Sequence, residues 1–259
     1  MKYGISELSI VPCRAEAADA SEMVTQLLFG EHFKVLERRK NWSRIRQAFD
    51  GYESWIDNKQ YILIDKEDYE RYNKASLVSS LELLSVLHNL ETGELITIPL
   101  GASLPEIENG KLTIQNSTYK FEEQLAYQAQ NFDKKNLVAV ADMYLNTPYL
   151  WGGRSPFGID CSGFTQLVYK LNGIKIPRDA YQQAELGDPL SFIEEAEPGD
   201  LAFFDNAEGK ITHVGIILAN NHIIHASGKV RVDRIDHQGI YNAETRDYSH
   251  KLRILKRIL

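Results

Sequence analysis

The chain has 259 residues, of which 43% are hydrophobic and 25% are charged, a composition typical of a globular protein with room for two or three small domains. The formal net charge of −7 argues against non-specific nucleic-acid binding, which requires clustered basic residues that this sequence lacks. Its apolar runs are shorter than the roughly 18 residues of a membrane-spanning helix, so no membrane partner is expected.

The start of the chain, Met1 to Glu7, lacks the apolar core of a secretory signal peptide. We therefore expect a cytoplasmic protein; the alternative is a chain from which a leader has been removed. Of the two cysteines, Cys13 lies in a strand-like run and is expected to be a reduced structural residue. This leaves Cys161 for chemistry. The sequence indicates no oligomeric state.

Residues 1–65 alternate short strand-like runs with turn residues, a pattern typical of a small β-barrel. Strands are predicted at Glu7–Val11, His32–Arg38, Trp42–Arg46 and Glu53–Ile56. The segment also contains, in order, Val11-Pro12-x-Arg14, Leu28-Phe29-Gly30-Glu31, Trp42-Ser43-Arg44-Ile45-Arg46 and Gly51-Tyr52-x-x-Trp55-Ile56. This series resembles a bacterial SH3 domain, so a first SH3-like barrel is expected here.

Residues 66–130 begin with a charged run that ends at Lys74 and predicts a short connecting helix with its charged face in water. Alternating apolar residues then return, at Glu82–Leu87, Leu95–Pro99, Lys111–Ile114 and Ser117–Phe121. We expect a second SH3-like barrel in this segment, with weaker sequence signals than the first.

Residues 131–259 mix helical and strand patterns. A helix is predicted over Lys135–Asn146 and is stopped by Pro148; a second begins at Cys161, where Asp160 can act as its cap. Strands are predicted afterwards, at Leu201–Phe204, His213–Leu218, Ile223–Ala226, Val230–Arg234 and Arg253–Ile258. A helix packed on such a mainly antiparallel sheet predicts an α+β, papain-like domain.

Cys161 is a candidate nucleophile because of its place in the first turn of a helix. Backbone N–H groups and the helix dipole favour a thiolate there, and a nearby imidazolium favours it further. Together these effects are expected to lower the pKa of the thiol from about 8.5 towards roughly 3.5–7.5.

Two downstream histidines are candidates for the base and its orienting partner. His213 and His225 lie on successive predicted strands joined by the turn Ala219-Asn220-Asn221, so a hairpin can bring them side by side. A cysteine, a histidine base and a third polar group form the general arrangement of an activated nucleophile.

The motifs of the last half of the chain resemble the NlpC/P60 cysteine peptidases. In order they are Tyr149-x-Trp151-Gly152-Gly153, Asp160-Cys161-Ser162-Gly163-Phe164, Pro177-Arg178, Pro198-Gly199-Asp200-Leu201, Thr212-His213-Val214-Gly215-Ile216 and His225-Ala226-Ser227. The resemblance implies an architecture of two SH3-like barrels, residues 1–65 and 66–130, followed by a papain-like peptidase domain over residues 131–259.

The resemblance also implies supporting roles. The backbone N–H of Cys161 is expected to donate to the oxyanion by its position, and the family pattern adds the Tyr149 hydroxyl. Trp151, Asp160 and Ser162 would surround the substrate, although Trp151 beside a Gly-Gly turn could serve packing alone. Arg178 and Asp200 are expected to order loops and not to take part in catalysis.

Substrate identity comes from the resemblance alone. The family cuts bacterial cell-wall peptides between γ-D-glutamate and a diamino acid, and this layout is similar to the dipeptidyl-peptidase VI branch, which releases L-Ala-γ-D-Glu. In that branch the first barrel supplies an acid and a tyrosine for the substrate's amine. These carry over to Glu22 and Tyr52, with a solvated Glu22 as the alternative.

No metal or organic cofactor is expected for this reaction. A zinc site made of His213, His222 and His225 is disfavoured, because strand alternation points His222 away from His225. The remaining histidines, His32, His88, His237 and His250, are expected to have no chemical role. Three rival functions stay open: a secreted cell-wall lysin with wall-targeting barrels, a binding protein with a vestigial site, and a thioester-based acyltransferase.

Overall fold

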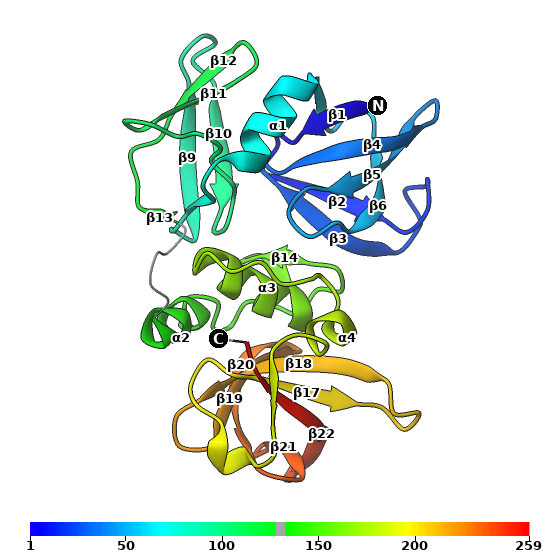
Figure 1. The fold of residues 1–259 in the computed structure, drawn as a ribbon, viewed down its shortest axis with the longest axis vertical. Helices are drawn as coiled ribbons and strands as arrows, with labels where there is room; N and C mark the ends of the chain where they lie inside the picture. The colour runs from blue at the N-terminus through cyan, green and yellow to red at the C-terminus, as the bar shows by residue number, and fades with distance from the viewer. Residues whose placement is uncertain (128–132, 259) are drawn as a thin grey trace. The chain divides into compact units, whose positions relative to one another are not determined.

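The computed structural model describes residues 1–127 and 133–258, which form two compact units (Figure 1). Among these residues, the first unit comprises 1–127, 151–156 and 170–175, and the second comprises 133–150, 157–169 and 176–258. The predicted boundary between residues 130 and 131 falls outside the described residues. None of the described helices has the length and apolar character needed to cross a membrane.

The first unit opens with a strongly bent antiparallel sheet whose strand order is β3-β2-β6-β5-β4-β1-β7 (Figure 1). Its strands are β1 (Lys2–Ile5), β2 (Ile10–Arg14), β3 (Met23–Leu28), β4 (His32–Arg38), β5 (Trp42–Gln47), β6 (Glu53–Asp57) and β7 (Ile62–Ile64). Alternate residues face a common core: in β5, Ser43, Ile45 and Gln47 are buried whereas Arg44 and Arg46 are exposed. Cys13 is fully buried in this core as a free thiol, as predicted.

A second β-module in the same unit follows helix α1 (Lys66–Lys74), which Asp65 caps by accepting from the Asp68 N–H. Its strands are β8 (Val78–Ser80), β9 (Leu84–Asn89), β10 (Leu95–Pro99), β11 (Lys111–Ile114), β12 (Ser117–Lys120) and β13 (Leu125–Tyr127). The sheet order is β10-β9-β12-β11, and β8 pairs with β13. The Tyr119 hydroxyl donates to Glu7, 2.8 Å away, and ties this module to the first sheet.

A buried charge cluster lies within the first unit. Glu31 receives a two-pronged ion pair from Arg154 on the short strand β14 (Arg154–Ser155), at 2.8 and 3.0 Å, and a third contact from Lys170 at 2.8 Å. Arg154 and Lys170 have fully buried side chains. Burial raises the pKa of Glu31, but the two cations outweigh burial and lower the pKa to about 2.

The second unit is built on a closed antiparallel barrel in the order β22-β17-β18-β19-β20-β21, because β22 also pairs with β21 (Figure 1). The barrel strands are β17 (Leu201–Asp205), β18 (Ile211–Leu218), β19 (His222–Ser227), β20 (Lys229–Ile235), β21 (Gly239–Asn242) and β22 (Asp247–Arg257). The unit also contains α2 (Lys134–Asp142), β15 (Gly158–Ile159), α4 (Ala180–Gln183), β16 (Asp188–Leu190) and a short 3₁₀ turn, Ile193–Glu195. Helix α3 (Cys161–Leu171) belongs to it up to Tyr169. The helices lie on one side of the barrel, whose interior is filled by Phe204, Ile217, Ile223 and their neighbours.

Most predicted elements are present, but several boundaries differ from the prediction, for example at β22, which begins at Asp247 and not at Arg253. The strand predicted at Glu7–Val11 begins only at Ile10, because the Ser6 hydroxyl bonds to the backbone of Leu8 and turns the chain. The helix predicted to reach Asn146 ends at Asp142. There, hydrogen bonds three residues apart, such as Tyr144 N–H to Ala141 C=O, replace the α-helical ones.

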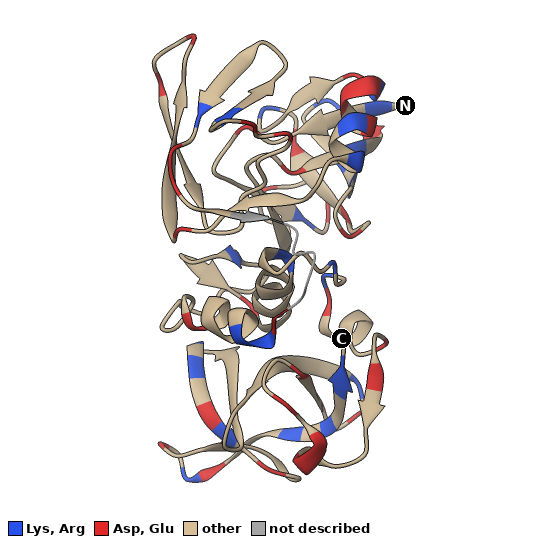
Figure 2. Ribbon diagram, turned by 60° about the vertical axis from the view of Figure 1, so that its left-hand side comes forward, with Lys and Arg blue, Asp and Glu red and all other residues tan. Residues whose placement is uncertain are grey.

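Charged residues are interspersed along both units. Figure 2 shows Lys and Arg alternating with Asp and Glu on strands, helices and loops instead of gathering by sign.

Replacing Glu31 by Ala should lower the free energy of unfolding by about 3–5 kcal/mol, because two buried cations lose their common partner. The matched control is Glu37→Ala, which breaks a half-exposed pair with Arg39 and should cost less than about 1 kcal/mol. Urea denaturation at pH 7 measures both. Since the pKa of Glu31 is lowered on folding, its contribution is complete above pH ~4.5 and is lost as the pH falls towards 2. Equal costs for the two variants would contradict the structural role of the cluster.

Candidate active site

Cys161 is the first residue of α3, and its neighbour Asp160 holds that turn in place. The Asp160 carboxylate accepts from the Gly163 N–H at 2.7 Å, so it caps the helix as predicted. Arg178 fixes the same carboxylate through two contacts, at 2.6 and 3.0 Å, and also donates to the Ser162 hydroxyl at 2.9 Å. Asp160, Ser162 and Arg178 therefore orient the nucleophile's turn.

The thiol of Cys161 lies against strand β18 on both sides of His213. Its Sγ atom is 4.0 Å from the carbonyl oxygen of Thr212, and the backbone N–H of Val214 is close enough to lower the pKa of the thiol. The helix start and the strand thus place the sulfur against the backbone of the two residues that flank His213, the predicted base.

His213 and His225 meet on one face of the β18–β19 hairpin. Gly215 pairs with His225 across the two strands, which makes His213 the diagonal neighbour of His225. Gly215 is required for this approach, since a Cβ atom there would lie 2.9 Å from the His225 Cβ atom and 2.7 Å from Ile223. The predicted side-by-side placement is present: His213 Nε2 lies 2.8 Å from His225 Nδ1.

The chain of hydrogen bonds continues to residues that the sequence reasoning missed. His225 Nε2 lies 3.0 Å from the carboxylate of Asp233, which in turn is held by Arg231 at 2.7 and 2.9 Å. Alternation in the sequence places Arg231 and Asp233 on one face of β20. The sequence does not show the register that pairs Arg231 with His225, so it could not assign Asp233 to the histidine pair.

Burial dominates the electrostatics of the nucleophile and its base. It raises the pKa of the Cys161 thiol to about 12, assisted by the Asp160 carboxylate and opposed by the N–H groups of Val214 and Ser162. It also lowers the pKa of His213 well below its usual value, with further lowering from His225 and His250. The expectation of a lowered thiol pKa was therefore wrong for the substrate-free site, where thiol and imidazole are both neutral.

Tyr149 is close enough to the nucleophile to interact with it electrostatically. Burial raises the pKa of its hydroxyl to about 12, and Cys161 and Asp160 add to the increase. The hydroxyl is accordingly protonated at neutral pH and can donate a hydrogen bond.

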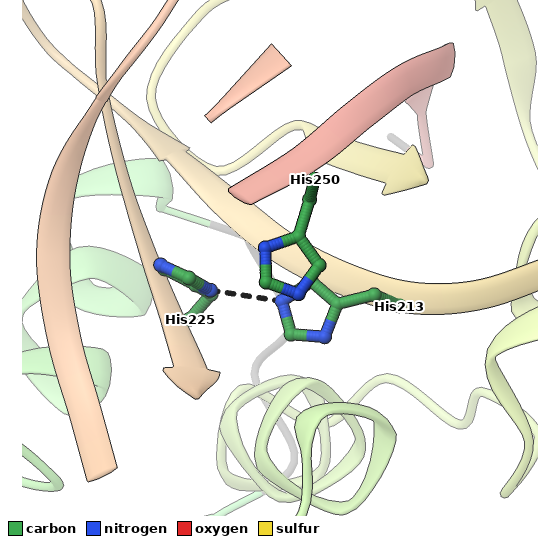
Figure 3. A group of neighbouring side chains, drawn as sticks. All are labelled: His213, His225 and His250. Carbon is green, nitrogen blue, oxygen red and sulfur yellow. Dashed lines mark hydrogen bonds between the residues drawn. The ribbon is translucent and has the colours of Figure 1, made fainter. Parts of the chain in front are cut away.

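His250, for which no role was predicted, stacks on His213 with ring centroids 4.1 Å apart and planes 23° from parallel (Figure 3). His213, His225 and His250 each bring one possible ligand atom within 4.8 Å of the others, a set that could be considered for a metal. His222, named in the sequence-based alternative, is not among them.

The ring geometry does not fit a metal site. Zinc with bonds of 2.0–2.1 Å requires donor nitrogens roughly 3.3 Å apart. His213 Nε2 and His225 Nδ1 are 2.8 Å apart, which is a hydrogen-bond distance. A ring nitrogen binds a metal in the plane of its ring, so the nearly parallel rings of His213 and His250 do not converge on one point. The arrangement suits proton transfer.

A groove of about 700 Å³ in the second unit is lined by Thr212, Tyr248 and His250, among other residues. Thr212 also contacts Cys161 and His250 stacks on His213, so two residues of the groove lie next to the nucleophile and the base, which themselves are not among its lining residues.

Three other predicted residues, Trp151, Glu22 and Tyr52, lie in the first unit. Trp151 is 60% exposed, which argues against the packing alternative, and its indole N–H donates to Glu22 at 2.6 Å. Glu22 is exposed and Tyr52 is half-buried. A Cβ atom on the neighbouring Gly152 would lie 2.3 Å from the Met23 carbonyl oxygen, so Gly152 is needed where this turn passes strand β3.

A helix-borne cysteine and a histidine pair on a barrel define a papain-like cysteine peptidase. A model of the NlpC/P60 family matches residues 146–248, and a model of the bacterial dipeptidyl-peptidase SH3 domain matches residues 13–60. The chain belongs to the NlpC/P60 family and carries an N-terminal SH3-like domain, as the motifs predicted.

Similar proteins support this assignment over most of the chain. The gamma-D-glutamyl-L-lysine dipeptidyl-peptidase of Bacillus subtilis is 30% identical over 78% of this chain and 71% of its own length. Dipeptidyl-peptidase 6 of Lysinibacillus sphaericus is 30% identical over 84% and 86%. The crystal structure of an NlpC/P60 family protein from Bacillus cereus ATCC 10987 has a TM-score of 0.84 over 99% of both chains at 20% identity, a likeness of fold.

Alkylation of Cys161 by iodoacetamide should accelerate steadily with pH in the substrate-free enzyme. Because the pKa of the thiol is raised, the thiolate fraction should grow about tenfold per pH unit between pH 6 and 9 without levelling off. Inactivation rates across this range measure the effect, and Cys13→Ser removes any signal from the other thiol. A plateau reached below pH 7 would instead demonstrate a preformed thiolate–imidazolium pair.

Proposed function

We propose that the enzyme hydrolyses the bond between γ-D-glutamate and an L-diamino acid in soluble murein peptides, with Cys161 as nucleophile, His213 as base and His225 as the residue that orients it. The observation that carries this proposal is the contact of the Cys161 thiol with β18 at His213, whose far nitrogen is already bonded to His225. The names of the two relatives support the choice of bond.

The geometry suggests a role for each group in the reaction. With Nε2 of His213 engaged by His225, Nδ1 is left to accept the thiol proton as sulfur attacks the carbonyl carbon. The Cys161 N–H and the Tyr149 hydroxyl donate to the developing oxyanion. His213 returns the proton to the leaving amine, and water then cleaves the thioester through the same base.

Proton transfer between two neutral groups fits the substrate-free electrostatics. Burial opposes charge on both Cys161 and His213, so the ion pair forms only as the carbonyl carbon takes up the sulfur electrons. His213 acts as the base in its neutral form, because the reaction uses the free lone pair of its imidazole ring.

We further propose that the substrate carries a free N-terminal L-Ala and that the enzyme releases L-Ala-γ-D-Glu during cytoplasmic recycling of murein peptides. The family resemblance and the dipeptidyl-peptidase names of the relatives support this. Glu22 and Tyr52 are the proposed ligands of the substrate ammonium. An acidic group there would disfavour substrates that lack the charge.

Cys161→Ser and His213→Ala should each lower kcat/KM for L-Ala-γ-D-Glu-L-Lys by at least about 10³-fold, because each removes a group that takes part in bond making. The measurement is digestion of the soluble peptide followed by mass spectrometry. His88→Ala, an exposed histidine of the first unit, is the control and should retain full activity. Near-normal turnover by either active-site variant would refute the assignment, and faster cleavage of intact sacculi than of the peptide would favour a cell-wall lysin.

Acetylation of the substrate's N-terminal amine should reduce kcat/KM by about two- to fivefold, since the ammonium loses its ion pair with Glu22, an exposed carboxylate that water can solvate in its place. The same comparison on Glu22→Gln isolates the residue: its rates on free and acetylated peptides should converge. If the wild-type enzyme cleaves both peptides equally well, Glu22 has no part in amine recognition.

A further inference from the structure

Asp233 on β20 is placed to control the histidine pair. The residue is 7% exposed, and its Oδ2 atom lies 3.0 Å from His225 Nε2. Arg231 contacts both carboxylate oxygens, Oδ2 through Nε at 2.7 Å and Oδ1 through Nη2 at 2.9 Å. The carboxylate is therefore clamped in one orientation, with Oδ2 directed at the imidazole.

The charge of this carboxylate determines which ring nitrogens carry hydrogen. Burial raises the pKa of Asp233, but its bonds to His225 and Arg231 outweigh burial and lower it, so the group is ionised at neutral pH and can only accept. His225 Nε2 must then carry the hydrogen. In neutral His225 this leaves Nδ1 as an acceptor, and the 2.8 Å contact requires His213 Nε2 to be the donor.

The tautomer of His213 decides whether this residue can accept the proton of the Cys161 thiol. When His213 carries hydrogen on Nε2, its Nδ1 atom has the free lone pair that a base needs. The opposite set of tautomers would place hydrogen on Nδ1, and His213 could not then accept the thiol proton. Both sets have the same heavy-atom positions, so packing alone does not select between them.

We propose that Asp233, clamped by Arg231, is a positioning residue that sets the tautomers of His225 and His213 and keeps the Nδ1 lone pair of His213 available to Cys161. This rests on the proposed function, in which His213 is the base. During attack the same chain stabilises the new imidazolium, because His213 Nε2–H donates towards a histidine that is bonded to an anion.

Asp233→Asn tests the proposal with little change of shape. The amide can donate to His225 Nε2, which permits the opposite tautomers, so kcat should fall about 10–100-fold with KM nearly unchanged. The matched control is Asp236→Asn, at the first residue after the same strand; its carboxylate accepts from the Tyr248 hydroxyl, and the variant should leave kcat unchanged. Thermal unfolding confirms that both variants are folded.

Nitrogen NMR of the imidazole rings tests the inference without catalysis. In Cys161→Ala, His213 should be protonated at Nε2 and unprotonated at Nδ1; adding Asp233→Asn should produce the Nδ1-protonated form. Because this readout needs no turnover, it distinguishes failure of the tautomer proposal from failure of the proposed function. Unchanged tautomers in the Asp233→Asn protein would overturn the proposal.

A double-mutant comparison supplies the second criterion. Asp233 acts through His225, so in a His225→Ala background Asp233→Asn should cost less than about twofold in kcat. Additive losses would show a general structural role and overturn the proposal. Arg231→Gln removes the clamp but leaves the Asp233 carboxylate charged, so it should reduce kcat by less than Asp233→Asn does. If Asp233→Asn does not fold, Arg231→Gln becomes the test, and wild-type kcat in that variant would contradict the clamp.

Discussion

The hydrogen bond between His213 and His225 is the interaction on which the active site depends. It fixes the plane of the base and decides which nitrogen is left for the thiol. Its 2.8 Å length is possible because Gly215 has no side chain between the strands and because the barrel closes through β22, which holds β17, β18 and β19 in one register. A loop could not hold two rings to this tolerance, since its backbone bonds would be shared with solvent.

In the substrate-free site, the Cys161 thiol and the His213 imidazole are both neutral. Burial that disfavours a thiolate protects Cys161 from oxidation and from chance electrophiles, because the thiolate is the reactive form. The same burial makes hydrogen-bond donors more effective once charge develops on the substrate oxygen. The buried Cys161 thiol is therefore less reactive towards oxidants and electrophiles in solution, but it can still attack the carbonyl group of a bound substrate.

The sequence predicted the parts of this site that depend on local pattern. Asp160 before a helical run predicted the cap, and two histidines on adjacent strands predicted a hairpin pair. Both predictions depend only on the spacing of apolar residues and on turn residues, which are features of neighbouring positions in the sequence. Asp233 and His250 were missed because their proximity to His225 and His213 comes from strand pairings across the barrel, which periodicity does not reveal. The thiol pKa was mispredicted for a related reason: the helix terminus is visible in the sequence, whereas the depth of burial that overrides it is a property of the whole fold.

The Glu31 cluster restricts which amino-acid substitutions the chain can accumulate one at a time. With Arg154 and Lys170 both buried, loss of Glu31 alone leaves two unpaired cations in the interior, whereas loss of either cation leaves the Glu31 carboxylate paired with the other. Substitutions that begin at Glu31 therefore pass through an unstable protein, whereas those that begin at one cation do not. In library selections, an acidic residue at position 31 should be retained wherever either of the two cations is retained.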